Sequence, residues 1–134
     1  MSVTYQDICQ AHERIKPFIH RTPILTSRII NELVGAELYF KCENFQKGGA
    51  FKARGAFNAV HSLSQDQLTK GLVTHSSGNH AAALALACAS RKAKATVVMP
   101  SNSPTPKKLA VAGYGATIVE CEPTLAARES TANK

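Results

Sequence analysis

The chain has 134 residues, of which 44% are hydrophobic and 19% charged, and this is enough for one globular domain with a hydrophobic core. Its formal net charge is +7, but the basic residues are scattered and no aromatic residues lie between the small basic clusters, so we expect no nucleic-acid partner. No segment approaches the roughly 18 apolar residues of a membrane span, and no signal-peptide pattern is visible. We therefore expect a cytoplasmic protein without a membrane partner.

Four segments of the N-terminal half have the periodicity of regular structure. The expected elements are helices over residues 4–16, 27–33 and 51–63 and a strand over residues 37–43. Thr4 and Asp7 give the first helix a capping-box-like start, and Pro17 interrupts it. Ser27 can cap the second helix, and Gly35 can end it. The polar stretch 64–70 that follows is the predicted domain boundary.

Strands and helices alternate regularly in the C-terminal half. The expected strands are 72–74, 95–99 and 117–119, the helices between them are 81–90 and 104–114, and a further helix starts at Thr124. This βαβαβ order predicts an α/β fold with a parallel sheet that is covered by helices on both faces.

The first candidate functional segment is Lys47-Gly48-Gly49-Ala50-Phe51-Lys52-Ala53-Arg54-Gly55-Ala56, at the start of the third predicted helix. Lys52 would lie near the positive end of the helix dipole and beside Arg54. Such surroundings disfavour the ammonium form and favour an amine nucleophile for Schiff-base chemistry. Taken alone, a lysine at such a position is an ordinary solvated surface residue.

The second candidate segment is Ser76-Ser77-Gly78-Asn79-His80, between a predicted strand and a predicted helix. It lies at the carboxyl end of a parallel strand, where open α/β sheets bind ligands, and its backbone N–H groups can hold an anion. The alternative is an ordinary turn in which Ser76 or Ser77 only caps the helix. Neither a dinucleotide-binding glycine motif nor a P-loop occurs, and the four cysteines show no metal-ligand spacing, so we expect no metal site and reduced thiols.

Together, Phe51-Lys52-x-Arg54-Gly55-Ala56 and Ser76-Ser77-Gly78-Asn79-His80 resemble the fold-type II pyridoxal-phosphate (PLP) enzymes, in the branch of the serine racemases and threonine/serine dehydratases. The resemblance extends through Thr22-Pro23, residues 41–47, Lys107-Lys108-Leu109 and Tyr114-Gly115-Ala116. It implies an incomplete α/β fold of the tryptophan synthase beta type. Residues 1–70 would be the N-terminal part of the large PLP-binding domain, and residues 71–134 a truncated small α/β domain. The phosphate-binding glycine loop and the metal ligands of the family would lie beyond Lys134.

The resemblance also implies a role for each motif residue. Lys52 would carry PLP covalently and act as a base at the substrate Cα, Phe51 would pack against the cofactor ring, and Asn79 would hydrogen-bond to the ring hydroxyl. The substrate carboxylate would be held by the loop of Ser76, Ser77, Gly78, Asn79 and His80. Many threonine dehydratases have alanine at the position of Ser77, whereas a serine resembles the racemases, in which it exchanges a proton on the face opposite the lysine.

His80 distinguishes this branch from cysteine synthase and cystathionine β-synthase, which usually have threonine there. The resemblance therefore implies interconversion of L- and D-serine, with β-elimination of serine to pyruvate and ammonia. Two alternatives remain open: a dehydratase of L-threonine, L-serine or threo-3-hydroxyaspartate, and a catalytically inactive truncated isoform that associates with full-length subunits. The full-length form is expected to be a homodimer that acts on a small amino acid.

Some racemases of this branch bind ATP at a subunit interface. The matching positions are Ser27, Arg28, Ile29, Lys47, Gly48 and Tyr114. Several of these differ in residue type, and the acidic and glutamine contacts of that site fall on Cys9 and Ala82 here. Mg²⁺ and ATP are thus expectations for the full-length enzyme only.

Overall fold

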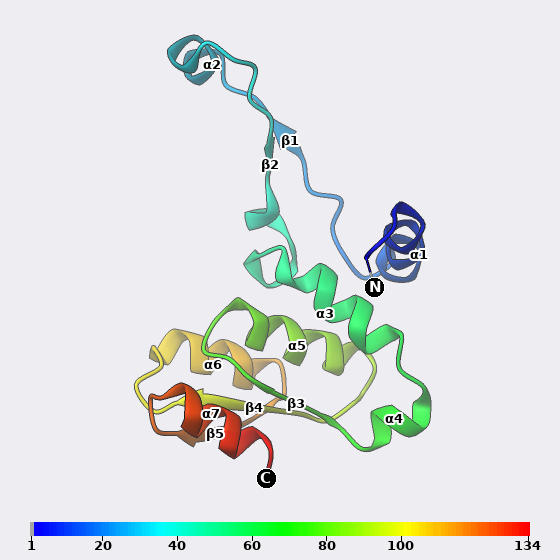
Figure 1. The fold of residues 1–134 in the computed structure, drawn as a ribbon, viewed down its shortest axis with the longest axis vertical. Helices are drawn as coiled ribbons and strands as arrows, with labels where there is room; N and C mark the ends of the chain where they lie inside the picture. Colours follow the sequence, from blue (N-terminus) through cyan, green and yellow to red (C-terminus); the bar gives the residue numbers. More distant parts are fainter. Residues whose placement is uncertain (1) are drawn as a thin grey trace.

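The computed structural model describes residues 2–134, and its C-terminal half is built on a three-stranded parallel sheet (Figure 1). The strands are β3 (Leu72–His75), β4 (Ala95–Pro100) and β5 (Thr117–Cys121), in the order β3-β4-β5. Helices α5 (Asn79–Ser90) and α6 (Thr105–Gly113) cover one face of the sheet, and α7 (Leu125–Ala132) lies against the other (Figure 1). The predicted βαβαβ unit is therefore confirmed.

The hydrophobic core lies between the sheet and α3 (Lys52–His61), with α5 in the middle. Alanines make up most of the buried face of α5, and small side chains allow α3 to pack closely on it. From α3, Phe57 and Val60 enter this core, and from β4, Val97 and Met99. The core thus joins residues from both sides of residue 70.

The polar stretch 64–70 contains a short helix, α4 (Gln65–Thr69), that the sequence pattern did not predict. Ser64 and Gln67 form a reciprocal capping box, which satisfies two backbone N–H groups at the start of the helix. Leu68 is buried to 2% exposure and anchors the helix to the core. The stretch 64–70 is therefore a packed connection between α3 and β3.

The N-terminal helix α1 (Tyr5–Ile15) begins and ends as predicted. The Thr4 side chain accepts a hydrogen bond from the Asp7 N–H at 3.2 Å, and the Asp7 carboxylate accepts one from the Thr4 N–H at 2.8 Å. Ile15 is buried against the core, and Phe18 stacks on His61 of α3 with ring centroids 4.0 Å apart. These contacts hold α1 against α3.

A long arm extends from this globular part (Figure 1). It consists of β1 (Ile24–Leu25), α2 (Arg28–Val34) at the tip, and β2 (Phe40–Lys41), which pairs antiparallel with β1. Gly35 ends α2 in the left-handed conformation with φ +66°, as predicted. The predicted strand 37–43 shrinks to two residues because β1 offers only two residues for pairing.

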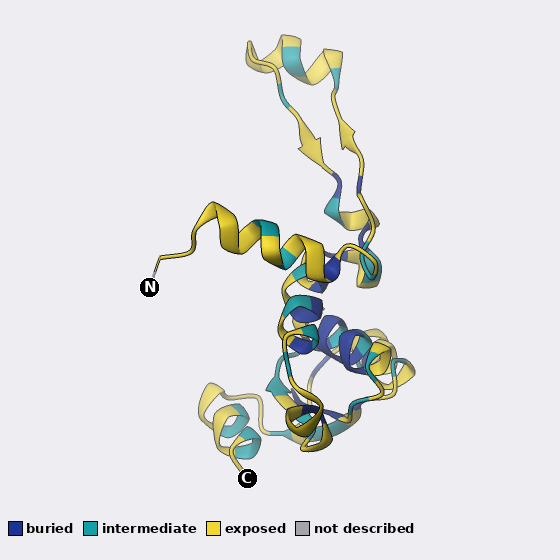
Figure 2. Cartoon of the chain, turned by 90° about the vertical axis from the view of Figure 1, so that its right-hand side faces the viewer, coloured by how far each residue is buried: buried dark blue, intermediate teal, exposed yellow. Residues whose placement is uncertain are grey.

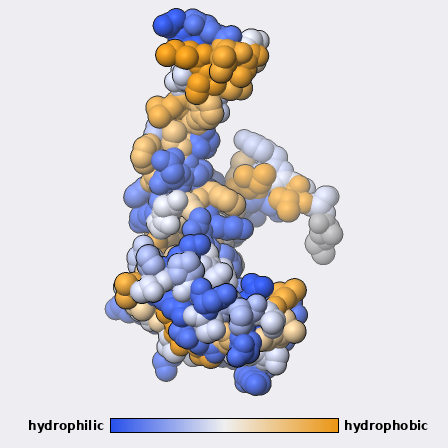
Figure 3. Space-filling model, turned by 90° about the vertical axis from the view of Figure 1, so that its left-hand side faces the viewer, coloured by the Kyte–Doolittle hydropathy of each residue, from blue (hydrophilic) through white to orange (hydrophobic). Residues whose placement is uncertain are grey.

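Most residues of the arm are exposed (Figure 2), and hydrophobic residues gather on it (Figure 3). These are Ile24, Leu25, Ile29, Leu33, Val34, Tyr39 and Phe40, with exposures between 43% and 83%. Below the arm, two short 3₁₀ turns, η1 (Glu43–Phe45) and η2 (Lys47–Gly49), connect β2 to α3. Among residues 2–134, no helix is long and apolar enough to cross a membrane.

Candidate active site

Lys52 is the first residue of α3, and its side chain is exposed. Its Nζ lies 5.0 Å from the centroid of the Phe51 ring, a separation at which an ammonium interacts with an aromatic face. Both residues line a cavity of about 360 Å³ together with His80 from the start of α5. The structure therefore brings Phe51 and Lys52 of the first motif together with His80 of the second, whereas Ser76, Ser77, Gly78 and Asn79 are not among the residues that line this cavity.

The loop Ser76–His80 leaves the carboxyl end of β3 and enters α5. The Ser76 N–H donates to the Val98 carbonyl at 3.1 Å, which continues the pairing of β3 with β4. The Gly78 N–H donates to the Ser76 Oγ at 3.2 Å. In the described part of the chain, the backbone N–H groups of Ser77, Asn79 and His80 have no acceptor. They are free to bind an anion at the N-terminus of a twelve-residue helix.

The alternative that Ser76 or Ser77 caps α5 is wrong. The N-cap residue is Gly78, and no side chain caps the helix. Ser77 is half-buried, and its hydroxyl makes no hydrogen bond to any residue between 2 and 134. The Ser77 hydroxyl is therefore not engaged in a hydrogen bond within the described chain.

The Arg54 guanidinium, which follows Lys52 by two residues, is paired with the Glu43 carboxylate. Its positive charge is therefore partly neutralised. Its Nε and one terminal nitrogen donate to Glu43 at 2.8 and 2.7 Å, and the Thr22 hydroxyl donates to the same carboxylate at 2.6 Å. The Arg54 hydrogen bonds, opposed in part by burial and aided by Thr22, lower the pKa of Glu43 from 4.5 to about 2. The network ties η1 and the base of the arm to α3.

The residues at this site fit the attachment point of PLP. Lys52 supplies an accessible amine, Phe51 an adjacent flat apolar surface, and the start of α5 unpaired N–H donors and the amide of Asn79. Within residues 2–134, no group of three or more His, Cys, Asp or Glu side chains is placed to hold a metal ion.

The six positions matched to an ATP site do not come together in this chain. Ser27 caps α2 and Arg28 and Ile29 begin it, at the tip of the arm, whereas Tyr114 ends α6 in the globular part (Figure 1). Lys47 and Gly48 lie in η2, between these two regions.

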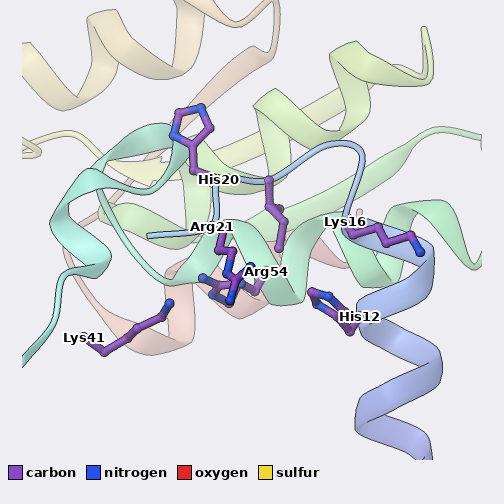
Figure 4. A pocket seen from close by; sticks show the side chains of 7 residues that line it. His12, Lys16, His20, Arg21, Lys41 and Arg54 are labelled. Atoms are coloured by element: carbon purple, nitrogen blue, oxygen red, sulfur yellow. The ribbon is translucent and has the colours of Figure 1, made fainter. Parts of the chain in front are cut away.

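Three features of the site were not predicted from the sequence. One is the pairing of Glu43 with Arg54, for which the only signal was a carboxylate in a largely basic stretch. The second is His75, which precedes the loop and has a buried Nδ1 without a partner in the described chain. The third is a larger cavity at the base of α1, lined mainly by basic side chains (Figure 4).

Comparison with known proteins identifies the family of the chain. The sequence profile of the pyridoxal-phosphate dependent enzymes matches residues 15–134, and the chain belongs to this family. Serine racemase of Dictyostelium discoideum is 57% identical over 129 residues, which are 96% of this chain and 40% of that protein. The beta-hydroxyaspartate dehydratase of Paracoccus denitrificans is also 57% identical, over 128 residues, 96% of this chain and 41% of that protein.

The fold is also similar to that of solved structures. The structure of maize serine racemase superposes with a TM-score of 0.97 at 45% identity, over 99% of this chain and 40% of that one. The incomplete fold-type II α/β architecture expected from the sequence is thereby confirmed. The chain spans about 40% of the length of the curated relatives it matches.

Proposed function

We propose that this chain supplies the two proton-transfer groups of a PLP-dependent serine racemase, which also converts serine to pyruvate and ammonia by β-elimination. The observation that carries the proposal is the meeting of Lys52 and His80 in one cavity, beside a loop on which Ser77 has a free hydroxyl. Identity of 57% to a serine racemase supports the same activity.

Bound PLP supplies an electron sink that stabilises the negative charge left at Cα when a proton is removed. The Lys52 amine holds the cofactor and then moves the α-proton on one face of the substrate. The Ser77 hydroxyl moves the proton on the other face, and two groups are needed because one base returns the proton to the face it left. Phe51 and Asn79 orient the cofactor, and the free N–H groups of the loop bind the substrate carboxylate.

The test is Ser77→Ala in the PLP-binding enzyme that contains this sequence. Interconversion of L- and D-serine should fall by about 10²-fold or more, a typical loss for a general acid or base. Pyruvate formation from L-serine should fall much less, because Lys52 alone removes that α-proton, whereas D-serine should be almost inert. Ser101→Ala, in an exposed turn, is the control and should leave both rates unchanged. If Ser77→Ala consumed both enantiomers at equal, near-native rates, the racemase proposal would fail and a dehydratase would be the remaining candidate.

The second candidate is a dehydratase of β-hydroxyaspartate, which the equal identity to the Paracoccus denitrificans enzyme favours. Such a substrate carries a second carboxylate. Comparing kcat/KM for L-serine and for L-threo-3-hydroxyaspartate in one preparation separates the two candidates. A preference of more than about tenfold for the dicarboxylic substrate, worth about 1.4 kcal/mol of transition-state binding, selects the dehydratase.

The proposal includes the assembly in which this chain works. The exposed apolar residues of the arm support packing of the arm against further polypeptide of the enzyme. We propose a homodimer of the complete enzyme, with residues 1–70 in the large domain and residues 71–134 in the small one. Binding of Mg²⁺ and ATP belongs to the same proposal. If the chain neither bound PLP nor restored enzymatic activity when combined with the further polypeptide of the enzyme, it would instead be a non-catalytic subunit.

A further inference from the structure

A basic cavity of about 580 Å³ lies between α1, residues 19–21, β2 and α3 (Figure 4). Its lining comprises four lysine or arginine side chains, two histidines and one isoleucine, without a carboxylate. In Figure 4, Arg21 and Arg54 project into its centre, Lys41 points in from one side and His12 from the other, while Lys16 and His20 point outward. The cavity shares only Arg54 with the cavity at Lys52.

The positive charge in this cavity is only partly neutralised. Arg54 is paired with Glu43, and Lys16 with Glu13 on α1. The Arg21 guanidinium makes no hydrogen bond or ion pair with any residue from 2 to 134, and the Lys41 ammonium donates only to the Thr22 carbonyl, at 2.7 Å. Arg21 therefore faces the cavity without a counter-charge, and Glu43, whose carboxylate lies close enough to act on Lys41, is already paired with Arg54. A concave surface with one sign of charge attracts small ions of the opposite sign.

We propose that this cavity binds a small oxyanion with at least two negative charges. An arginine guanidinium presents parallel donors that match a carboxylate or a phosphate, and an ammonium adds a point charge that both accept. The volume falls in the range of small-molecule sites, so a ligand larger than one phosphate fits. Ile19 gives the wall an apolar patch for the carbon atoms of an organic ligand. A di- or polyphosphate and a dicarboxylate share this chemistry, and the assay distinguishes them.

The test is isothermal titration calorimetry of inorganic pyrophosphate into the 134-residue chain at low ionic strength. We expect one saturable site per chain, with an affinity that falls as salt is added. Arg21→Gln should raise Kd at least about tenfold, the effect of losing a charge-assisted hydrogen-bonding group. Arg91→Gln is the matched control because it removes the same charge outside the cavity, and it should change Kd less than about twofold.

Arg21 is exposed, and within residues 2–134 its side chain makes no hydrogen bond or ion pair that its replacement would remove. Circular dichroism checks the fold of each variant, and Lys41→Gln provides a second variant with the same expected loss. Succinate and acetate are titrated in parallel: tighter binding of pyrophosphate than of succinate identifies a phosphate compound, and the reverse order a dicarboxylate. The proposal is overturned if neither dianion binds saturably, if acetate binds equally well, or if the Arg21 and Arg91 variants weaken binding equally.

Discussion

Replacing Glu43 by glutamine tests the network that joins the base of the arm to α3. Glu43 is 19% exposed and accepts hydrogen bonds from both Arg54 and Thr22. The difference between its usual pKa of 4.5 and the value of about 2 corresponds to about 3 kcal/mol at about 1.4 kcal/mol per pKa unit. The introduced amide keeps part of the hydrogen bonding, and solvent screens part of the charge interaction. We therefore expect Glu43→Gln to lower the free energy of unfolding by about 2 kcal/mol at pH 7.

The same network gives the wild-type chain a pH dependence with a definite sign. Because the pKa of Glu43 is lower in the folded chain, its stabilisation is complete above pH 4.5 and is lost as the pH falls toward about 2. Urea unfolding followed by circular dichroism at pH 7, 4.5 and 3 measures it. The difference in stability between wild type and Glu43→Gln should shrink steadily between pH 4.5 and 3.

The control is Glu32→Gln, which breaks the exposed pair of Arg28 and Glu32 on α2. An exposed pair contributes little, so a change within about 0.5 kcal/mol is expected. If Glu43→Gln lost no more stability than Glu32→Gln, or if its loss were the same at pH 7 and pH 3, the assignment of the low pKa to this network would be refuted.

Further predictions concern the core, one turn and one histidine. Phe57→Ala should lower the free energy of unfolding in urea by about 3–5 kcal/mol, because the Phe57 side chain on α3 is only 2% exposed and packs in the core. A loss below about 1 kcal/mol would contradict this packing. Gly71→Ala should cost about 1–2 kcal/mol, because φ is +79° and the new Cβ would lie 3.3 Å from the Lys94 carbonyl oxygen; Gly113→Ala, with open space and no positive φ, is its control. Burial, and to a smaller extent Arg91, lower the pKa of His61, so its stabilisation is complete above pH 6.5 and is lost as the pH falls through the lower folded pKa. His61→Gln should remove this part of the pH dependence, and an unchanged pH profile would disprove it.

The elements that were predicted well are those with local signals. The capping box of Thr4 and Asp7, the left-handed Gly35 and the cap Thr124 each act within a few residues, so the sequence alone indicates where α1, α2 and α7 begin or end. The strands and helices of the C-terminal half follow from periodicity in the same way. The short length of β2 was not predictable, because a strand extends only as far as its partner, and β1 provides two residues.

The site was predictable only in part for a similar reason. Lys52 and His80 stand in motifs with a chemical meaning, and both line one cavity. The pairing of Arg54 with Glu43 and the basic cavity could not be predicted from the sequence. They assemble from residues that are far apart in the chain, such as Arg21 and Lys41, and no local pattern indicates that these meet.

The central claim, that Lys52 is the lysine that holds PLP, is tested most directly by reductive labelling. The chain is incubated with equimolar PLP, treated with borohydride to fix the cofactor on its lysine, digested and analysed by peptide mass spectrometry. We expect Lys52 to carry more of the label than any other lysine, and Lys52→Ala to lose this label together with the visible absorbance of bound PLP. A label spread evenly over the exposed lysines, or concentrated on a lysine other than Lys52, would contradict it.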